Sequence, residues 1–166
     1  PDQVYLIDNR GDAKTVSCVV TTDGLDKVVA DQKGRERNYD AGSITRVVFG
    51  KITPAYRDAM GYADAGDLDN AVRKFRVAAD DADARQPVRA MARFRAASSL
   101  MAAAAKDSAN TEWKSVVAEF DRFLNDYPSN RQVPAARRHQ ARAQLLAGEA
   151  QLAAELGAAI LGDLDT

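Results

Sequence analysis

The chain has 166 residues, of which 46% are hydrophobic and 28% are charged, and its net charge at pH 7 is −1. These values are typical of a globular chain that is long enough to bury a core. A charge so close to zero creates no overall field that would draw the chain to nucleic acid or to an anionic membrane. No apolar stretch approaches the roughly 18 residues of a membrane-spanning helix, so the sequence predicts no membrane span.

The start of the chain and its one cysteine bear on the compartment. The sequence begins with Pro1 rather than Met and shows no signal peptide, so we expect that a leader or a tag has been removed. This slightly favours an exported protein, periplasmic or extracellular. Cys18 has no partner for an intrachain disulfide and lies among valines, which predicts a buried core thiol. A reactive or intermolecular thiol is the alternative.

Residues 1–52 have the pattern of β-strands. Short segments rich in β-branched and aromatic residues are separated by turn residues, and they cover 4–8, 14–22, 26–32, 35–39 and 44–49. This predicts a five-stranded antiparallel small barrel or roll, in the form of a rolled sheet or open barrel, which resembles the SH3-like class in architecture. Basic and acidic residues balance and no aromatic platform is evident, so a nucleic-acid-binding barrel is not favoured.

From Thr53 onward the apolar period becomes helical, and Thr53-Pro54 is a good N-cap and first-turn pair. Helices are predicted over 54–65, 68–83, 87–105, 111–127, 134–147 and 149–161. One continuous helix over 134–161 is the alternative, because an isolated glycine such as Gly148 costs only about 1 kcal/mol in a helix. The predicted division is a β-domain at 1–52 and a helical domain at 53–166.

Two stretches of the helical part carry a family pattern. The first contains Tyr62, Gly66-Asp67, Ala71 and Phe75, and the second contains the form F-x2-F-L-x2-Y-P over residues 120–128, preceded by Val116. These residues resemble the tetratricopeptide repeat, in the form common in bacterial envelope repeat proteins. The match covers about residues 54–147. The resemblance implies a helical solenoid of two to three hairpins, so the expected fold class is α+β.

The pattern departs from the family at two places. Asp58 stands where a large apolar residue is usual, and the step from Phe75 to Phe120 is longer than the family's 34 residues. The second repeat must therefore have a lengthened helix and loop.

Catalytic and metal-binding patterns are scarce. His139 is the only histidine and has no second ligand for a zinc site, so we expect a solvated helix histidine. Asp80, Asp81 and Asp83 lack the glycine and the distal glutamate of a calcium loop and are expected at a solvated helix end. Phosphate-binding, hydrolase and metalloprotease motifs are absent from the sequence. We expect a protein that is not an enzyme and uses no cofactor or metal.

Charges are sorted between the predicted helices. The first helices of the proposed pairs carry a net positive charge and the second helices a net negative charge. The family resemblance implies that the first helices line a concave face, and hence a basic groove on an acidic back. The candidate residues for binding other proteins, including acidic segments, are Arg89, Arg93, Arg138 and Arg142. The alternative is that these charges lie on solvated faces and are neutralised by neighbouring helices.

The C-terminal segment is more apolar than one packed helix requires. Its leucines and isoleucine spread over about half of a helix circumference, whereas an apolar stripe of somewhat over 100° suffices. We expect a homo-oligomer with Leu152, Leu156 and Ile160 at its interface. A continuation of the chain that covers this surface, and a segment that folds back at Gly148, are the alternatives.

The sequence as a whole predicts a protein–protein interaction or structural assembly subunit, which binds partners or copies of itself through the helical repeat surface. The alternative is a nucleic-acid-binding protein that uses the β-domain and the arginine-rich helices, with an affinity that falls steeply with salt.

Overall fold

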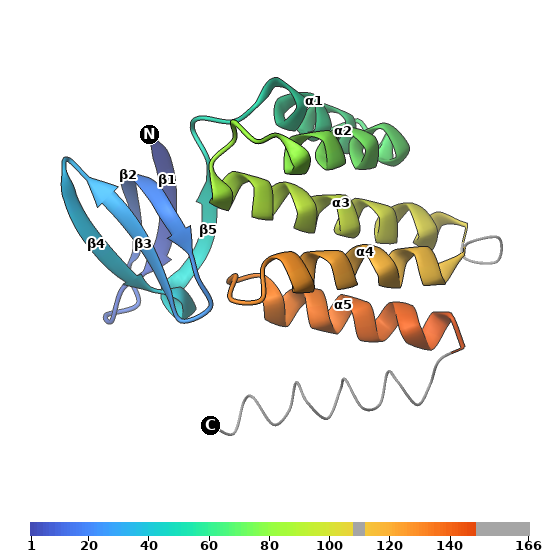
Figure 1. The fold of residues 1–166 in the computed structure, drawn as a ribbon. Helices are drawn as coiled ribbons and strands as arrows, with labels where there is room; N and C mark the ends of the chain where they lie inside the picture. Colours follow the sequence, from blue (N-terminus) through green and yellow to red (C-terminus); the bar gives the residue numbers. More distant parts are fainter. Residues whose placement is uncertain (108–111, 149–166) are drawn as a thin grey trace.

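An antiparallel sheet lies at one end of a series of stacked helices in the computed structural model, which describes residues 1–107 and 112–148 (Figure 1). Within these residues five strands are followed by five helices, which confirms the α+β class. The strands are β1 (Asp2–Ile7), β2 (Ala13–Asp23), β3 (Lys27–Gln32), β4 (Arg35–Asp40) and β5 (Ile44–Val48), and a short 3₁₀ helix, η1 (Ala41–Ser43), precedes β5.

The sheet is open, so the predicted barrel is corrected to an open sheet. Its strand order is β4-β3-β2-β1-β5, with β4 and β5 at the edges. Strands β1 to β4 pair in chain order, and β5 returns to pair with β1, where Val4 lies opposite Val47. Strand β4 reads Arg-Glu-Arg-Asn-Tyr-Asp and exposes every side chain except Tyr39, which is half-buried. It therefore has too little apolar surface to close the sheet.

The turn between β3 and β4 requires an unusual backbone. Lys33 and Gly34 have φ values of 57° and 79°, and the N–H of Gly34 donates a 2.9 Å hydrogen bond to Asp31 Oδ1. Two consecutive positive φ values match the right-handed twist of a tight hairpin, and glycine adopts them without steric cost. This turn keeps β4 in register with β3.

The helices are α1 (Pro54–Asp64), α2 (Leu68–Asp80), α3 (Gln86–Lys106), α4 (Trp113–Asp126) and α5 (Val133–Leu146). Each lies within three residues of its predicted bounds. The Thr53 hydroxyl accepts a hydrogen bond from the N–H of Tyr56 at 3.2 Å, which confirms the predicted N-cap of α1.

Helix α5 ends at Leu146, and Gly148 beyond it has a φ of +82°. Because that conformation lies outside the helical region, the alternative of one unbroken helix over 134–161 is wrong at this point. The predicted helix over 149–161 lies outside the described residues.

Two apolar clusters form the core. The first joins the sheet to helices α1, α2 and α3, and the second joins the C-terminal half of α3 to α4 and α5. Phe120 and Phe123 are fully buried in the second cluster, as the repeat pattern predicts, and Phe94 packs against both clusters. Cys18 is a buried thiol of the first cluster, as predicted, and burial raises its pKa. The division at residue 52 stays a prediction, and residues from both sides of it share the first cluster.

A buried ion pair fixes the sheet to the start of α3. Asp2 is 1% exposed, and its two carboxylate oxygens accept hydrogen bonds from Arg85 Nη1 at 2.8 Å and Nη2 at 2.7 Å. The backbone N–H groups of Val20 and Gly50 each donate a further bond at 2.8 Å. Burial alone would raise the pKa of Asp2, but these four hydrogen bonds together outweigh it and the pKa is lowered.

A second buried ion pair fixes the sheet to the loop between α4 and α5. Asp23 is 3% exposed and accepts a hydrogen bond from Arg131 Nε at 2.8 Å. The N–H of Leu25 donates to the carbonyl of Ser129 at 2.7 Å, and the N–H of Arg131 donates to the carbonyl of Asp23 at 3.1 Å. The sheet is thus held at the start of α3 and at the loop before α5, and β5 is positioned beside them through its pairing with β1.

Candidate functional site

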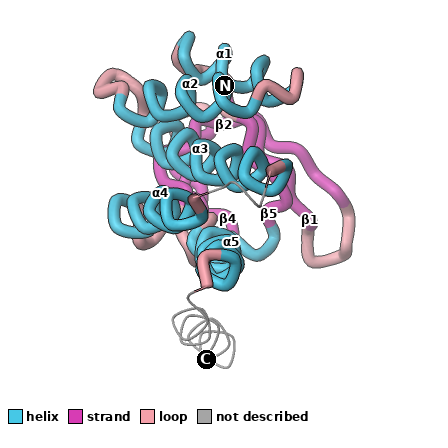
Figure 2. Tube along the Cα trace, turned by 90° about the vertical axis from the view of Figure 1, so that its right-hand side faces the viewer, coloured by secondary structure: helices cyan, strands magenta, loops and turns pink. Residues whose placement is uncertain are grey.

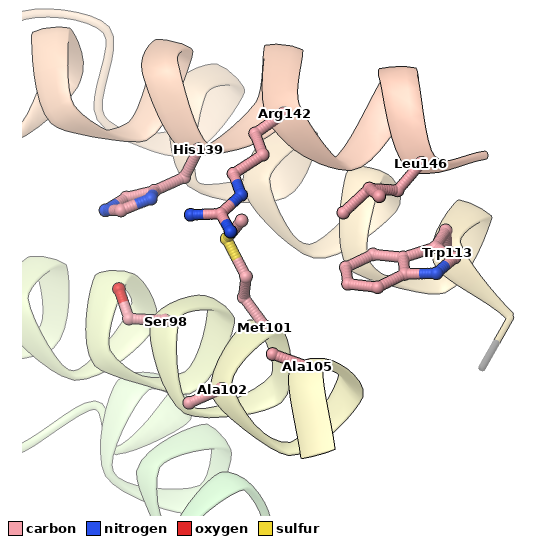
Figure 3. A pocket seen from close by; sticks show the side chains of 8 residues that line it. All are labelled: Ser98, Met101, Ala102, Ala105, Trp113, His139, Arg142 and Leu146. Carbon is pink, nitrogen blue, oxygen red and sulfur yellow. The ribbon is translucent and has the colours of Figure 1, made fainter. Parts of the chain in front are cut away.

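Two neighbouring hollows lie along one side of α3. The distal hollow has a volume of about 410 Å³ and lies between α3, α5 and the first residue of α4 (Figure 3). The junction hollow, of about 320 Å³, lies between α3, β5 and the loop before α5. Ser98 lines both, and we call the two together the α3–α5 groove. The distal hollow is lined by Ser98, Met101, Ala102, Ala105, Trp113, His139, Arg142 and Leu146, and the junction hollow by Thr45, Arg46, Val47, Met91, Phe94, Arg95, Ser98, Arg131 and Gln132.

The groove forms because α3 is long and changes character around its circumference. Its 21 residues reach from the sheet to the start of α4. Val88, Ala92 and Ala96 face the first core cluster, whereas Ala102 and Ala105, on the groove side, are exposed. Small side chains at these last two positions leave space that larger ones would fill. Viewed along the helices, α4 lies to one side of α3 and α5, and β1 and β5 are seen on the other (Figure 2).

The distal hollow has an apolar lining. The Trp113 ring lies beside Leu146, and Met101 projects from α3 toward Arg142 (Figure 3). Trp113 is 7% exposed, so its ring forms part of the wall rather than an open platform. Leu146 is 48% exposed, and the neighbouring Leu145 is 58% exposed. The helix end at this hollow therefore offers apolar surface to a ligand.

The walls of the groove are positively charged. Arg46, Arg95 and Arg142 line it and form no ion pair within the described part of the chain, whereas Arg131 is paired with Asp23. Among the described residues that line either hollow, none is a carboxylate. Within the described residues, the positive charge of the groove is therefore not compensated by a carboxylate, although the whole chain is close to neutral.

Two of these arginines contact tyrosines of the protein, Arg46 through the ring of Tyr5 and Arg95 through the hydroxyl of Tyr56. The Cζ atom of Arg46 lies 4.3 Å from the centre of the Tyr5 ring, a cation–π contact. The Nε atom of Arg95 is buried and lacks a hydrogen-bond partner among the described residues. Burial raises the pKa of Tyr56. The positive charge of the neighbouring Arg95 and its hydrogen bond to the Tyr56 hydroxyl reduce this rise. An anion that reached Arg95 would thus meet a guanidinium whose bonding capacity is only partly used.

His139 lies on a helix as predicted, but it is half-buried, so the prediction of a solvated histidine holds only in part. Its ring stacks on Phe120, with 5.7 Å between the ring centres and 25° between the planes, and it also contacts Phe94 at 6.5 Å. The second core cluster attracts the flat face of the imidazole because that face is apolar. Burial lowers the pKa of His139, and the charges of Arg138 and Arg142 lower it further.

Ser98 and His139 line the same hollow, which raises the question of nucleophilic catalysis (Figure 3). The hydroxyl of Ser98 donates its proton to the backbone carbonyl of Phe94 at 2.9 Å. In the described part of the chain no carboxylate is paired with His139 to orient its ring. The pair therefore lacks the geometry of an activated serine.

Of the four arginines predicted for a basic groove, only Arg142 lines the α3–α5 groove. Arg93 is 6% exposed, and its guanidinium lies 2.5 Å from Asp80 and 3.7 Å from Asp126. Arg89 is half-buried and Arg138 is exposed. Of the four, Arg142 is the one that lines a described hollow. A role of the other three in partner binding stays a prediction.

Sequence reasoning missed Arg46, Arg95 and Trp113 as groove residues. Arg93 and Arg95 are two positions apart, which places them on different sides of a helix. A search by helix side rather than by helix would have grouped Met91, Arg95, Ser98 and Ala102, which follow one another at spacings of three and four. No sequence signal identifies Arg46, because its place beside α3 depends on how the sheet docks.

The remaining predictions concern the aspartate cluster at the end of α2, the C-terminal interface and membrane spans. Asp80 and Asp83 are exposed, and within residues 1–107 and 112–148 no group of three or more potential ligands could hold a metal ion. The proposed interface residues Leu152, Leu156 and Ile160 lie outside the described residues. No helix that the structure describes has the length and apolarity to cross a membrane.

Comparison with protein-family models finds no match for this chain, and comparisons with curated proteins and with solved structures find none either.

Proposed function

We propose that this chain is a non-enzymatic interaction subunit, which binds other proteins or copies of itself through a surface of tetratricopeptide-like helices. The observation that carries the proposal is the α3–α5 groove, an elongated surface with apolar and cationic parts that the fold leaves open. Binding surfaces combine an apolar centre with polar groups that fix orientation.

The packing of the helices supports the repeat-like part of the proposal. Each helix packs mainly against the next one along the chain, and α3 also contacts α5. Ala71 and Phe75, which carry the family resemblance in the first stretch, are buried, as are Phe120 and Phe123 in the second. A chain built this way offers its non-consecutive helices, here α3 and α5, as one continuous surface.

The contacts around His139 support a binding role over catalysis. The ring is packed on Phe120, Ser98 is engaged by a backbone carbonyl, and neither hollow is lined by a described carboxylate. General acid–base chemistry usually requires a proton donor or acceptor that a neighbouring group orients toward the substrate, and no described carboxylate orients the His139 ring. The groove offers shape and charge instead.

Nucleic-acid binding has weaker support. The exposed basic residues Lys33, Arg35 and Arg37 lie at the β3–β4 hairpin, and the nearest aromatic side chain of that strand, Tyr39, is half-buried. Binding of single strands usually combines positive charge with exposed aromatic rings on which bases stack. A mobility-shift assay at two salt concentrations would detect such binding by its steep salt dependence.

Site-specific photo-crosslinking in the source cells tests the proposed function. A benzophenone amino acid replaces Ala102, an exposed residue of the distal hollow, and in a matched control it replaces Val77, a 59% exposed residue of α2 that lines no described hollow. We expect discrete protein adducts from position 102 and not from position 77. Adducts at 77 alone, or none at 102, would contradict the proposal.

A further inference from the structure

We propose that the α3–α5 groove recognises an extended acidic segment of a partner protein, with its carboxylates at Arg46, Arg95 and Arg142 and one apolar side chain in the distal hollow. This inference rests on the proposed function, because it names the chemistry of the ligand for the same surface.

The length of the groove suits an extended segment. Along α3 its lining runs from Met91 to Ala105, which at about 1.5 Å per residue is roughly 21 Å of helix. An extended chain advances about 3.3 Å per residue, so about six or seven residues would cover this distance. A segment of this size is long enough to meet the arginines at both ends of the groove.

The charge of the groove selects acidic ligands. Arg46 and Arg95 line the junction hollow and Arg142 lines the distal hollow, and none is paired with a described carboxylate. Guanidinium groups form bidentate, charge-assisted hydrogen bonds with carboxylates. Arg95 is only partly buried where it lines the junction hollow, so it is one residue that an acidic ligand could contact there.

The apolar part of the distal hollow favours a ligand that carries an apolar side chain besides its acidic groups. Met101, Trp113 and Leu146 form its apolar wall, and Ala102 and Ala105 open the space between them (Figure 3). A leucine-sized side chain placed there would cover the exposed part of Leu146. Burial of a side chain of this size favours binding, partly offset by the loss of ligand freedom. The recognised segment should therefore carry an apolar residue among its acids.

The same walls argue for a peptide over a nucleic acid. A single strand needs aromatic faces that are open to its bases, whereas Trp113 is 7% exposed and the ring of His139 stacks on Phe120. The Tyr5 ring is covered by Arg46. Phosphates could still reach the arginines, so an oligonucleotide belongs among the test ligands.

Fluorescence anisotropy on the full chain tests the inference. The probe is a fluorescein-labelled octapeptide with one central leucine and glutamate at the other positions. One comparison peptide has glutamine in place of every glutamate, and another has glycine in place of leucine. An eight-nucleotide oligothymidylate is the nucleic-acid control.

The variants separate local from global charge effects. Arg142→Glu reverses the charge of an exposed residue that lines the groove. Arg73→Glu changes the chain's charge by the same amount at an exposed position of α2. Ala102→Glu adds negative charge at an exposed groove position without removing an arginine, and a thermal melt checks that each variant folds.

We expect Arg142→Glu and Ala102→Glu each to raise the Kd of the octapeptide about tenfold or more, as the loss of a charge-assisted contact implies, and Arg73→Glu to change it less than twofold. Both comparison peptides should bind more weakly. Equal weakening by Arg73→Glu, equal binding of the glutamine peptide, or tighter binding of the oligothymidylate would overturn the inference. If the octapeptide fails to bind but position 102 still crosslinks to a protein, this inference fails and the proposed function stands.

Discussion

At the scale of single residues, the fold depends on a few buried charges that connect distant parts of the chain. Asp2 and Arg85 are 83 positions apart, and their two hydrogen bonds join the first strand to the start of α3. Such a pair is weak evidence of net stability, but removal of one partner leaves the other charge buried without compensation.

The first prediction concerns this pair. Asp2→Asn should lower the free energy of unfolding by about 3 kcal/mol, because Arg85 would lose its charged acceptor in a largely dry site. Denaturant unfolding of both proteins measures the change. Asp58→Asn is the control, because Asp58 of α1 pairs with Lys74 at an exposed site and its loss should leave the midpoint nearly unchanged. Equal effects of the two substitutions would mean that the Asp2 pair does not hold the sheet.

The second prediction concerns His139, whose pKa in the folded chain lies below its ordinary value of 6.5. The unfolded chain therefore binds more protons between these two pKa values, and stability rises with pH in that window. Stability should be highest above pH 6.5 and fall as the pH drops below it. Urea unfolding at pH 5.5 and 7.5 measures the difference, which His139→Gln should reduce. An unchanged difference in the variant would show that another group titrates.

At the scale of elements, apolar period and capping residues determine most of the secondary structure. The alternation of valines in most of the strands and the three- and four-residue spacing in the helices appear in the sequence itself, and they place these elements within a few residues of their observed bounds. Whether the sheet would close into a barrel or stay open was not predictable in this way. It depends on the edge strand β4, whose charged residues can form a strand but leave no apolar face.

The third prediction tests the second core cluster. Phe120 is fully buried between α3, α4 and α5 and stacks on His139, so Phe120→Ala should lower the free energy of unfolding by about 3–5 kcal/mol through the cavity it leaves. Val77→Ala removes an exposed side chain of α2 and should change stability by less than about 0.5 kcal/mol. Thermal melts that place the two variants within a degree or two of each other would contradict the assigned packing.

At the scale of the whole molecule, the groove depends on contacts that sequence patterns do not reveal. Arg46 comes from β5, Arg95 from α3 and Arg142 from α5, and the docking of the sheet through Asp2 and Asp23 brings them to one groove. Periodicity assigns a residue to a side of its own element, but it does not say which element will lie opposite. The sequence therefore shows how many arginines the chain carries, but it does not show which of them lie together in the fold.

The fourth prediction concerns self-association. The homo-oligomer expected through Leu152, Leu156 and Ile160 stays a prediction, because these residues lie outside the described part of the chain. Leu145, near the end of α5, is 58% exposed. Light scattering at tens of micromolar should give a dimer or larger assembly. Leu156→Asp should return it to a monomer, because a charge at an apolar interface is costly to bury. A parent chain that is already monomeric would contradict the expectation.

The groove as the binding surface can be tested directly through the three methionines of the chain. Met91 lines the junction hollow and Met101 the distal hollow, whereas Met60 of α1 lines neither. With ¹³C-labelled methionine methyl groups, saturation with the leucine-containing acidic octapeptide should shift the signals of Met91 and Met101 and leave Met60 in place. A shift of Met60 alone, or no shift of any methionine at saturation, would contradict binding in the groove.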